Sequence, residues 1–194
     1  MRSTRHAVRL VVLGDSISRG VGASVPRRSL VGRVADYIAL ETDRPVHIAN
    51  YSQSGATAND VLNKQIPRVD LQVTDVILLE IGVNDSYRRT VKEFQQDLGA
   101  IIKLLPLNKT IIADIPFSKI RRPYQKIAHV ILSDKRIIRA TVSEAFVHFI
   151  PAFWVTSGDF FHPNDKGYKL WFEAFRPGID TILQRSNLLK SERK

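Results

Sequence analysis

The chain has 194 residues, with 29 Lys and Arg against 19 Asp and Glu, and therefore a formal net charge of +10. This length predicts a single domain over residues 1–194, able to bury roughly 70% of its unfolded surface, with a mobile basic tail at 187–194. The absence of cysteine excludes disulfides and thiolate metal sites. The basic residues are scattered and no series of aromatic residues accompanies them, so we expect no nucleic-acid partner.

The first residues do not show the pattern of a secretory leader, and the sequence leaves open whether a leader has been removed. Residues 1–6 lead directly into an apolar run that lacks a small-residue cleavage pattern. No segment approaches the length of a transmembrane helix. We therefore expect a cytoplasmic protein without integral membrane association, and the sequence leaves its oligomeric state open.

The first predicted strand ends in a candidate nucleophile. Residues 8–13 are almost continuously apolar, the run stops at Gly14, and Ser16 follows two residues later. Such a run predicts a central parallel strand covered on both faces, and open α/β sheets bind ligands at the carboxyl ends of their strands. The alternative is a Gly-Asp-Ser turn that only closes the strand.

Predicted helices and strands alternate along the rest of the chain. The patterning predicts helices near 29–41, 59–68, 90–105, 123–145 and 164–186, and strands at 46–49, 75–81, 110–115 and 146–150. This alternation predicts a five-stranded parallel sheet with helices on both faces. We expect a three-layer α/β/α sandwich with the flavodoxin-like strand order 2-1-3-4-5.

In that topology, the loops after strands one, two, three and five meet at one edge of the sheet. They carry Ser16, Gly55, Asn84 and the pair Asp159/His162. A serine hydrolase needs a neutral imidazole to remove the hydroxyl proton and a carboxylate to orient that imidazole. Ser16, His162 and Asp159 are therefore the candidate catalytic residues. The N–H groups of Ser16 and Gly55 and the amide of Asn84 are the candidate oxyanion donors.

These residues give the chain a resemblance to the SGNH hydrolase superfamily, also called GDSL esterases and lipases. That family supplies serine, glycine, asparagine and histidine in this order, in blocks that here read GDSIS at 14–18, NYSQSG at 50–55, GVND at 82–85 and DFFHP at 159–163. Ile17 replaces the leucine of the family's nickname. The resemblance implies hydrolysis of carboxylic esters or thioesters through an acyl-serine intermediate, without a metal or other cofactor. Thioesterase, lysophospholipase and carbohydrate deacetylase activities all remain open.

Further residues near these blocks are candidate substrate contacts. Arg88 and Arg89 follow the asparagine loop closely enough to meet an anionic group, although charged pairs are usually solvated. Phe160 and Phe161 are candidates for the acyl pocket, with core packing as the alternative. Asp15 is expected to stabilise the turn around Ser16 and is counted among the possible substrate contacts.

Two neighbouring carboxylates are expected to have structural roles. Asp85 is expected to brace the Asn84 loop. Asp165 is a candidate cap for the last helix.

Two other functional classes fit parts of the sequence. A non-catalytic α/β binding module could use the basic surface to hold an acidic partner or nucleic acid. A phosphate- or nucleotide-binding flavodoxin-like protein would explain the polar first loop, but it leaves Asp159 and His162 without a role. We expect a small-molecule ester or thioester as the partner.

Overall fold

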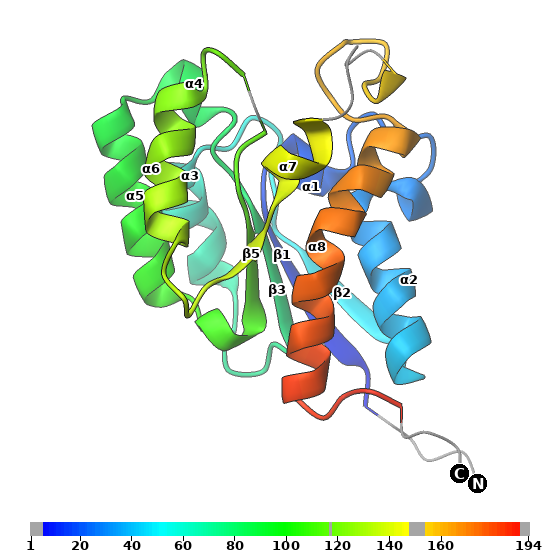
Figure 1. Cartoon of the computed structure of the whole chain (residues 1–194). Helices are drawn as coiled ribbons and strands as arrows, with labels where there is room; N and C mark the ends of the chain where they lie inside the picture. Colours follow the sequence, from blue (N-terminus) through cyan, green and yellow to red (C-terminus); the bar gives the residue numbers. More distant parts are fainter. Residues whose placement is uncertain (1–5, 117, 148–153, 191–194) are drawn as a thin grey trace, which may run out of the picture.

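The computed structural model describes residues 6–116, 118–147 and 154–190. Its centre is a five-stranded parallel sheet with the order β2-β1-β3-β4-β5 (Figure 1). The strands are β1 (Val8–Gly14), β2 (Val46–Asn50), β3 (Val76–Glu80), β4 (Thr110–Ala113) and β5 (Ile138–Ala140). The predicted fold class and strand order are confirmed.

The helices between the strands follow the predicted alternation. The α-helices are α1 (Ser16–Arg19), α2 (Leu30–Thr42), α3 (Ala58–Asp60), α4 (Asp85–Arg88), α5 (Val91–Leu104), α6 (Arg122–Leu132), α7 (Val142–Val147) and α8 (Asp165–Arg185). Short 3₁₀ helices span Pro26–Arg28, Ile66–Arg68 and Leu107–Lys109.

The fifth strand was predicted at the wrong place. It was expected at 146–150, but β5 lies within the stretch predicted as one helix over 123–145. That helix ends early, at Leu132, and a polar turn follows in which the Asp134 side chain accepts hydrogen bonds from the backbone and guanidinium of Arg136. Phe146 belongs to α7, and residues 148–150 lie outside the described residues. The turn depends on hydrogen bonds of polar side chains, and the spacing of apolar residues does not predict these bonds.

The segment predicted as one helix over 59–68 changes its winding twice. It starts as α3, widens into a π-helix at Val61–Gln65 and ends as a 3₁₀ turn that contains Pro67. The buried Gln65 amide reaches the end of β1, where its Oε1 accepts from Gly14 N and its Nε2 donates to Gly14 O, both at 2.9 Å. This segment therefore holds the backbone just before Ser16.

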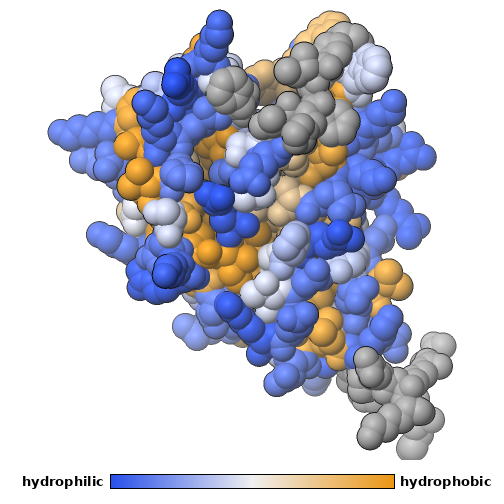
Figure 2. Space-filling view, viewed as in Figure 1, coloured by the Kyte–Doolittle hydropathy of each residue, from blue (hydrophilic) through white to orange (hydrophobic). Residues whose placement is uncertain are grey.

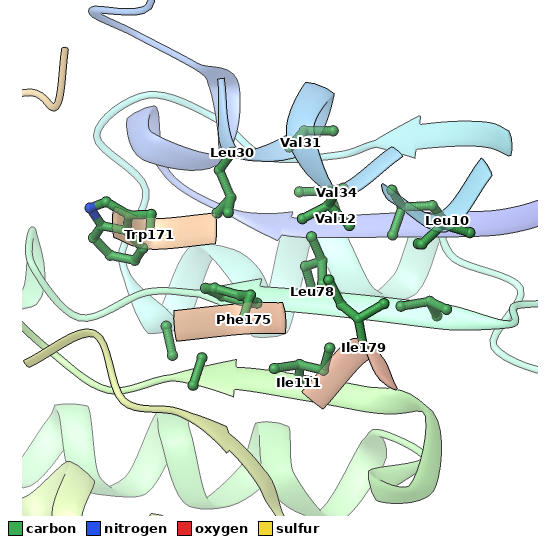
Figure 3. Close-up of a cluster of buried hydrophobic side chains, with 14 of the residues drawn as sticks. Leu10, Val12, Leu30, Val31, Val34, Leu78, Ile111, Trp171, Phe175 and Ile179 are labelled. Carbon is green, nitrogen blue, oxygen red and sulfur yellow. The ribbon is translucent and has the colours of Figure 1, made fainter. Parts of the chain in front are cut away.

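Two apolar cores fill the spaces on either side of the sheet. On one side, α2 and α8 pack on the strands, and Figure 3 shows Leu30 and Val34 of α2 facing Phe175 and Ile179 of α8 across Leu78. On the other side, α3, α5 and α6 cover the sheet with a second cluster. β1, β3 and β4 are almost entirely buried between the two layers, which explains their continuous apolar runs, whereas the edge strand β2 is partly exposed.

Helix caps fix where the main helices begin. As expected, Ser29 caps α2, and Thr90 forms a capping box with Glu93 at α5. The cap of α8 is Asn164, whose Oδ1 accepts from the backbone N–H groups of Lys166 and Gly167, and not Asp165 as predicted. Asp165 instead accepts hydrogen bonds from Ser24 and Arg28, at 2.7 and 2.9 Å.

The described surface is largely hydrophilic. In Figure 2, an apolar band lies near the middle of the view, between the helices that flank β5 in Figure 1. Within the residues described, the structure contains no helix that combines the length and apolarity needed to span a bilayer. Residues 187–190, expected to begin a mobile tail, bond to the domain, since Lys190 N donates to Glu41 O at 2.9 Å. Residues 191–194 lie outside the described part.

Candidate active site

The turn from β1 into α1 places Ser16 at the carboxyl end of the central strand. Gly14 has φ +143°, and a Cβ there would lie 2.2 Å from the carbonyl oxygen of Glu80 on the neighbouring strand. Asp15 caps α1 by accepting a hydrogen bond from Ile17 N at 2.9 Å. Ser16 is then the first residue of the helix, and only 5% of its surface is exposed.

The structure brings Ser16, His162 and Asp159 together. The Ser16 Oγ lies 2.9 Å from His162 Nε2, and His162 Nδ1 lies 2.5 Å from Asp159 Oδ2. A carboxylate can only accept, so Nδ1 carries the proton and Nε2 is free to accept from the serine hydroxyl. The bond to His162, together with bonds from Ser157 and the Phe161 N–H, holds the pKa of Asp159 below its ordinary value. Asp159 therefore stays ionised and orients the ring.

Gly22, which the sequence analysis did not connect with the site, lets the histidine loop approach Ser16. Gly22 has φ +92°, and a Cβ there would lie 2.4 Å from the Pro163 carbonyl oxygen and 3.2 Å from His162 Cβ. The contact joins the loop after β1 with the loop that carries His162, and these loops lie far apart in the sequence, so it can be recognised only in the folded chain. The sequence signal is the glycine itself, which follows Gly20 in a polar loop.

The two phenylalanines of the histidine loop differ in position. Phe161 meets the His162 ring edge-on with ring centroids 5.0 Å apart, and the Arg121 guanidinium lies 5.7 Å from the Phe161 ring centroid. Phe160 has a left-handed backbone, with φ 56°, and 76% of its surface is exposed. Phe161 thus flanks the imidazole, whereas Phe160 projects into solvent.

The candidate oxyanion donors lie in the loops after β2 and β3. Gly55 has φ +78°, and its carbonyl oxygen accepts from Arg88 Nη1 at 2.8 Å. Asn84 Nδ2 donates to Asp15 Oδ2 at 2.8 Å and to the Ala56 carbonyl at 3.1 Å. Asn84 therefore bridges the residue before Ser16 and the residue after Gly55, and both hydrogens of its amide are engaged.

Glu80 is a buried acid of the site that sequence reasoning missed. Its side chain is hydrogen-bonded to that of Asp15, and each residue is only 1% exposed. Burial raises the pKa of both carboxyls, and the charge of Asp15 raises the pKa of Glu80 further. The available sequence signal was an acidic residue within the apolar run at 75–81.

Asp85 links the asparagine loop to α3. It is fully buried, and both of its carboxylate oxygens lie 3.1 Å from Ala58 N. Burial raises the pKa of Asp85 to about 7. The expected brace is thus a bond between the loop that carries Asn84 and the loop that carries Gly55.

The two arginines after this loop have different surroundings. Arg89 forms ion pairs with Glu93 at 3.3 Å and with Asp97 at 3.2 Å. Arg88 is exposed and lies beside Gly55, and among the described residues it has no carboxylate partner. Only Arg88 therefore offers an uncompensated charge next to the candidate oxyanion donors.

Other features of the described residues lie apart from Ser16. A cavity of about 690 Å³ is lined by residues such as His6, Arg9, His47, Tyr51 and Asp75, and it includes none of the candidate site residues. Within the described ranges, no group of three or more His, Asp or Glu side chains is placed to hold a metal ion.

The chain is similar in sequence to a known protein family and to individual known proteins. A family model described as the GDSL-like lipase/acylhydrolase family matches residues 12–170. An arylesterase of Vibrio mimicus is 30% identical over 122 residues, which cover 62% of this chain and 58% of the relative. The uncharacterised protein YpmR of Bacillus subtilis is 26% identical over 137 residues, or 69% of this chain and 48% of the relative. The chain thus spans about half the length of these two proteins.

Solved structures share the fold. A lipase/acylhydrolase from Enterococcus faecalis superposes with a TM-score of 0.77 at 20% identity, covering 96% of this chain and all of the other. The acetylxylan esterase Axe2 from Geobacillus stearothermophilus gives a TM-score of 0.70 at 20% identity, covering 89% of this chain and 94% of the other.

Proposed function

The chain belongs to the GDSL-like lipase/acylhydrolase family, and we propose that it is a serine-dependent hydrolase of carboxylic esters or thioesters. The observation that carries this proposal is the continuous hydrogen-bonded series from Ser16 Oγ through the His162 ring to Asp159. Such a series activates a hydroxyl that is otherwise a weak nucleophile at neutral pH.

In the proposed reaction, Ser16 Oγ attacks the carbonyl carbon of the ester while His162 Nε2 takes the hydroxyl proton. Asp159 holds the charged ring in place, as its ionised state and its bond to Nδ1 allow. When the tetrahedral intermediate collapses, the bond to the leaving oxygen or sulfur breaks and His162 returns the proton to it. Water, deprotonated by His162 Nε2, then attacks the carbonyl carbon of the acyl-Ser16 ester. The bond between that carbon and Ser16 Oγ breaks, His162 returns the proton to Oγ, and the acid is released.

The N–H groups of Ser16 and Gly55 and the amide of Asn84 are the proposed donors to the oxyanion. Asn84 already uses both amide hydrogens, so the substrate oxygen must compete for one of them. The better candidate is the Asn84 hydrogen that is donated to the Ala56 carbonyl, because that bond is the longer one and its acceptor is neutral. Binding a developing negative charge there would exchange a neutral acceptor for a charged one.

The substrate proposal rests on two observations. The arylesterase and acetylxylan esterase relatives are esterases by name, so simple carboxylic esters are the first substrates to test. Arg88 beside Gly55 favours an ester that carries a negative charge near the scissile bond.

The direct test is Ser16→Ala with p-nitrophenyl acetate as substrate. We expect kcat to fall on the order of 10⁴-fold or more, because the attacking atom is lost while the fold is kept. Ser133→Ala, at an exposed position just after α6, is the matched control and is expected to leave turnover unchanged.

A fluorophosphonate probe gives an independent reading of the same proposal. It should attach to Ser16 in the wild type and fail to attach in Ser16→Ala. Undiminished turnover in Ser16→Ala, or labelling at another residue, would contradict the assignment.

A further inference from the structure

Two buried carboxyl groups lie directly behind the candidate nucleophile. Gly14 and Glu80 are paired in the register of β1 and β3, and Asp15 is the next residue after Gly14, so Asp15 and Glu80 leave neighbouring strands close to each other. Their side chains are hydrogen-bonded to each other, and the backbone N–H of Asp15 also donates to the Glu80 carboxyl. Two carboxylates cannot accept from each other, so a direct bond between them requires that one holds a proton.

The surrounding donors indicate which group carries the charge. Asp15 accepts from Ile17 N at 2.9 Å and from Asn84 Nδ2 at 2.8 Å. Beyond the Asp15 pair, Glu80 has the Ser18 hydroxyl at a longer 3.4 Å. Charge-assisted hydrogen bonds are the stronger ones, so the better-supplied Asp15 carries the negative charge and Glu80 carries the proton.

We propose that Glu80 is a positioning residue that keeps one proton in its pair with Asp15. Asp15 then carries a single negative charge, and its carboxylate holds Asn84 and the first turn of α1 in fixed positions relative to each other. This inference rests on the proposed hydrolase function. Asp15 caps the helix that begins with Ser16 and also binds the amide proposed to stabilise the oxyanion. The nucleophile and one oxyanion donor are thereby tied to the same carboxylate.

Loss of the shared proton would place two negative charges behind the nucleophile. Repulsion between them would disturb the Asp15 contacts to Ile17 and Asn84, which should lower kcat more than it raises KM. In the described part of the chain, the other titratable groups that face the pair are His162, on which a positive charge would lower the pKa of Asp15, and Tyr168 of α8. Tyr168 donates to the Val21 carbonyl at 2.6 Å, and burial raises its pKa, so it stays neutral and adds no charge.

The test compares Glu80→Gln with Glu80→Leu at similar side-chain volume. Glutamine is neutral and still offers an N–H to Asp15, so we expect kcat within about threefold of wild type. Leucine offers no donor, and we expect kcat to fall by about 10²-fold, comparable to the loss of one oxyanion donor. The alkaline decline of kcat in the wild type should be absent in Glu80→Gln, since no proton remains to be lost.

A double-mutant cycle shows whether Glu80 acts through Asn84. If it does, Glu80→Leu combined with Asn84→Ala should lower kcat no further than the worse single variant. Additive losses would overturn the proposal. So would a glutamine variant as impaired as the leucine variant, or one that keeps the wild-type alkaline decline.

Thermal unfolding across pH tests the pair without any substrate. The folded protein holds a proton on Glu80 that the unfolded chain releases, so the contribution of this pair to stability is greatest at low pH and is lost as pH rises through the raised pKa of Glu80. The melting temperature of Glu80→Gln relative to wild type should therefore increase with pH, and an unchanged difference would overturn the proposal. If Ser16→Ala kept full turnover, the hydrolase assignment alone would fail, and this measurement would still decide the state of the pair.

Discussion

Three buried or hydrogen-bonded acids near Ser16 show how surroundings set the state of one functional group. Asp159 receives several hydrogen bonds and its pKa is lowered, whereas burial raises the pKa of Glu80 and of Asp85. An orienting carboxylate must be ionised, and a carboxyl that donates to its neighbour must be protonated. Carboxyl groups in neighbouring loops and strands therefore have pKa values shifted in opposite directions, as the proposed roles of Asp159 and Glu80 require.

Arg88 offers a residue-scale test of the substrate proposal. We expect Arg88→Gln to lower the ratio of kcat/KM for p-nitrophenyl hemisuccinate to that for p-nitrophenyl butyrate by about fivefold, the size of an interaction of about 1 kcal/mol at the surface. Lys92→Gln removes an equal, exposed charge from α5 and should leave the ratio unchanged. If Arg88→Gln left the ratio unchanged, Arg88 would not contribute to substrate preference, and its role would be limited to the hydrogen bond with the Gly55 carbonyl.

At the residue scale, sequence reasoning found the side chains that carry recognisable chemistry. Ser16, Asn84 and His162 stand in blocks with family spacing, and the structure places them together. It could not find Glu80 or Gly22, because their significance comes from neighbours distant in sequence. It also treated Arg88 and Arg89 as equivalent, and only the folded chain separates them.

At the scale of elements, the site depends on bonds between the ends of different strands and helices. Gln65 holds Gly14 at the end of β1, and Asp85 at the start of α4 holds Ala58 at the start of α3. Each bond replaces backbone pairing that the loops lack. The loops are thereby fixed relative to the sheet without forming regular structure themselves.

The Asp85 link predicts a pH dependence of stability. Its pKa of about 7 in the folded protein lies above the ordinary value of a carboxyl, so its stabilising effect is greatest at low pH and is lost as pH rises through 7. Asparagine at this position stays neutral at every pH. The melting temperature of Asp85→Asn relative to wild type should therefore be higher at pH 9 than at pH 5, by about 3 °C for each kcal/mol of unfolding free energy that wild-type Asp85 loses over this range.

Scanning calorimetry at the two pH values would measure this difference. Asp70→Asn, at an exposed position, controls for the change in net charge and should show a constant difference. A constant difference for Asp85→Asn as well would show that Asp85 is ionised throughout this range.

Element boundaries were predictable where caps and apolar periodicity agreed. This holds for α2 and α5, which begin after Ser29 and Thr90 as expected. It failed for β5, a three-residue strand whose apolar pattern is too short to separate from the helix before it. The π-helical turn before Ile66 could not be predicted from the spacing of apolar residues either, because it depends on contacts with β1.

At the scale of the whole molecule, α8 connects the core to the histidine loop. It packs on the sheet through Trp171, Phe175 and Ile179, and its first turn is tied to the loop after α1 through Asp165. Gly167 allows this start, because a Cβ there would lie 2.1 Å from the Val155 carbonyl oxygen. Packing of the last helix and placement of His162 are therefore linked.

Phe175→Ala tests this link. Phe175 is fully buried, and its truncation should lower the free energy of unfolding by about 3–5 kcal/mol and the melting temperature by roughly 10 °C. Phe172→Ala, a half-buried position on the same helix, should have a clearly smaller effect. Thermal unfolding followed by circular dichroism measures both, and equal losses would contradict the assigned role of Phe175 in the core.

The contact between Ser16 and His162 joins residues 146 positions apart. During synthesis the Ser16 hydroxyl therefore leaves the ribosome long before the His162 imidazole. In the proposed reaction, a nascent chain that already holds all five strands, the last of which ends at Ala140, still lacks the base that activates its nucleophile. We therefore expect esterase activity to depend on the last quarter of the chain.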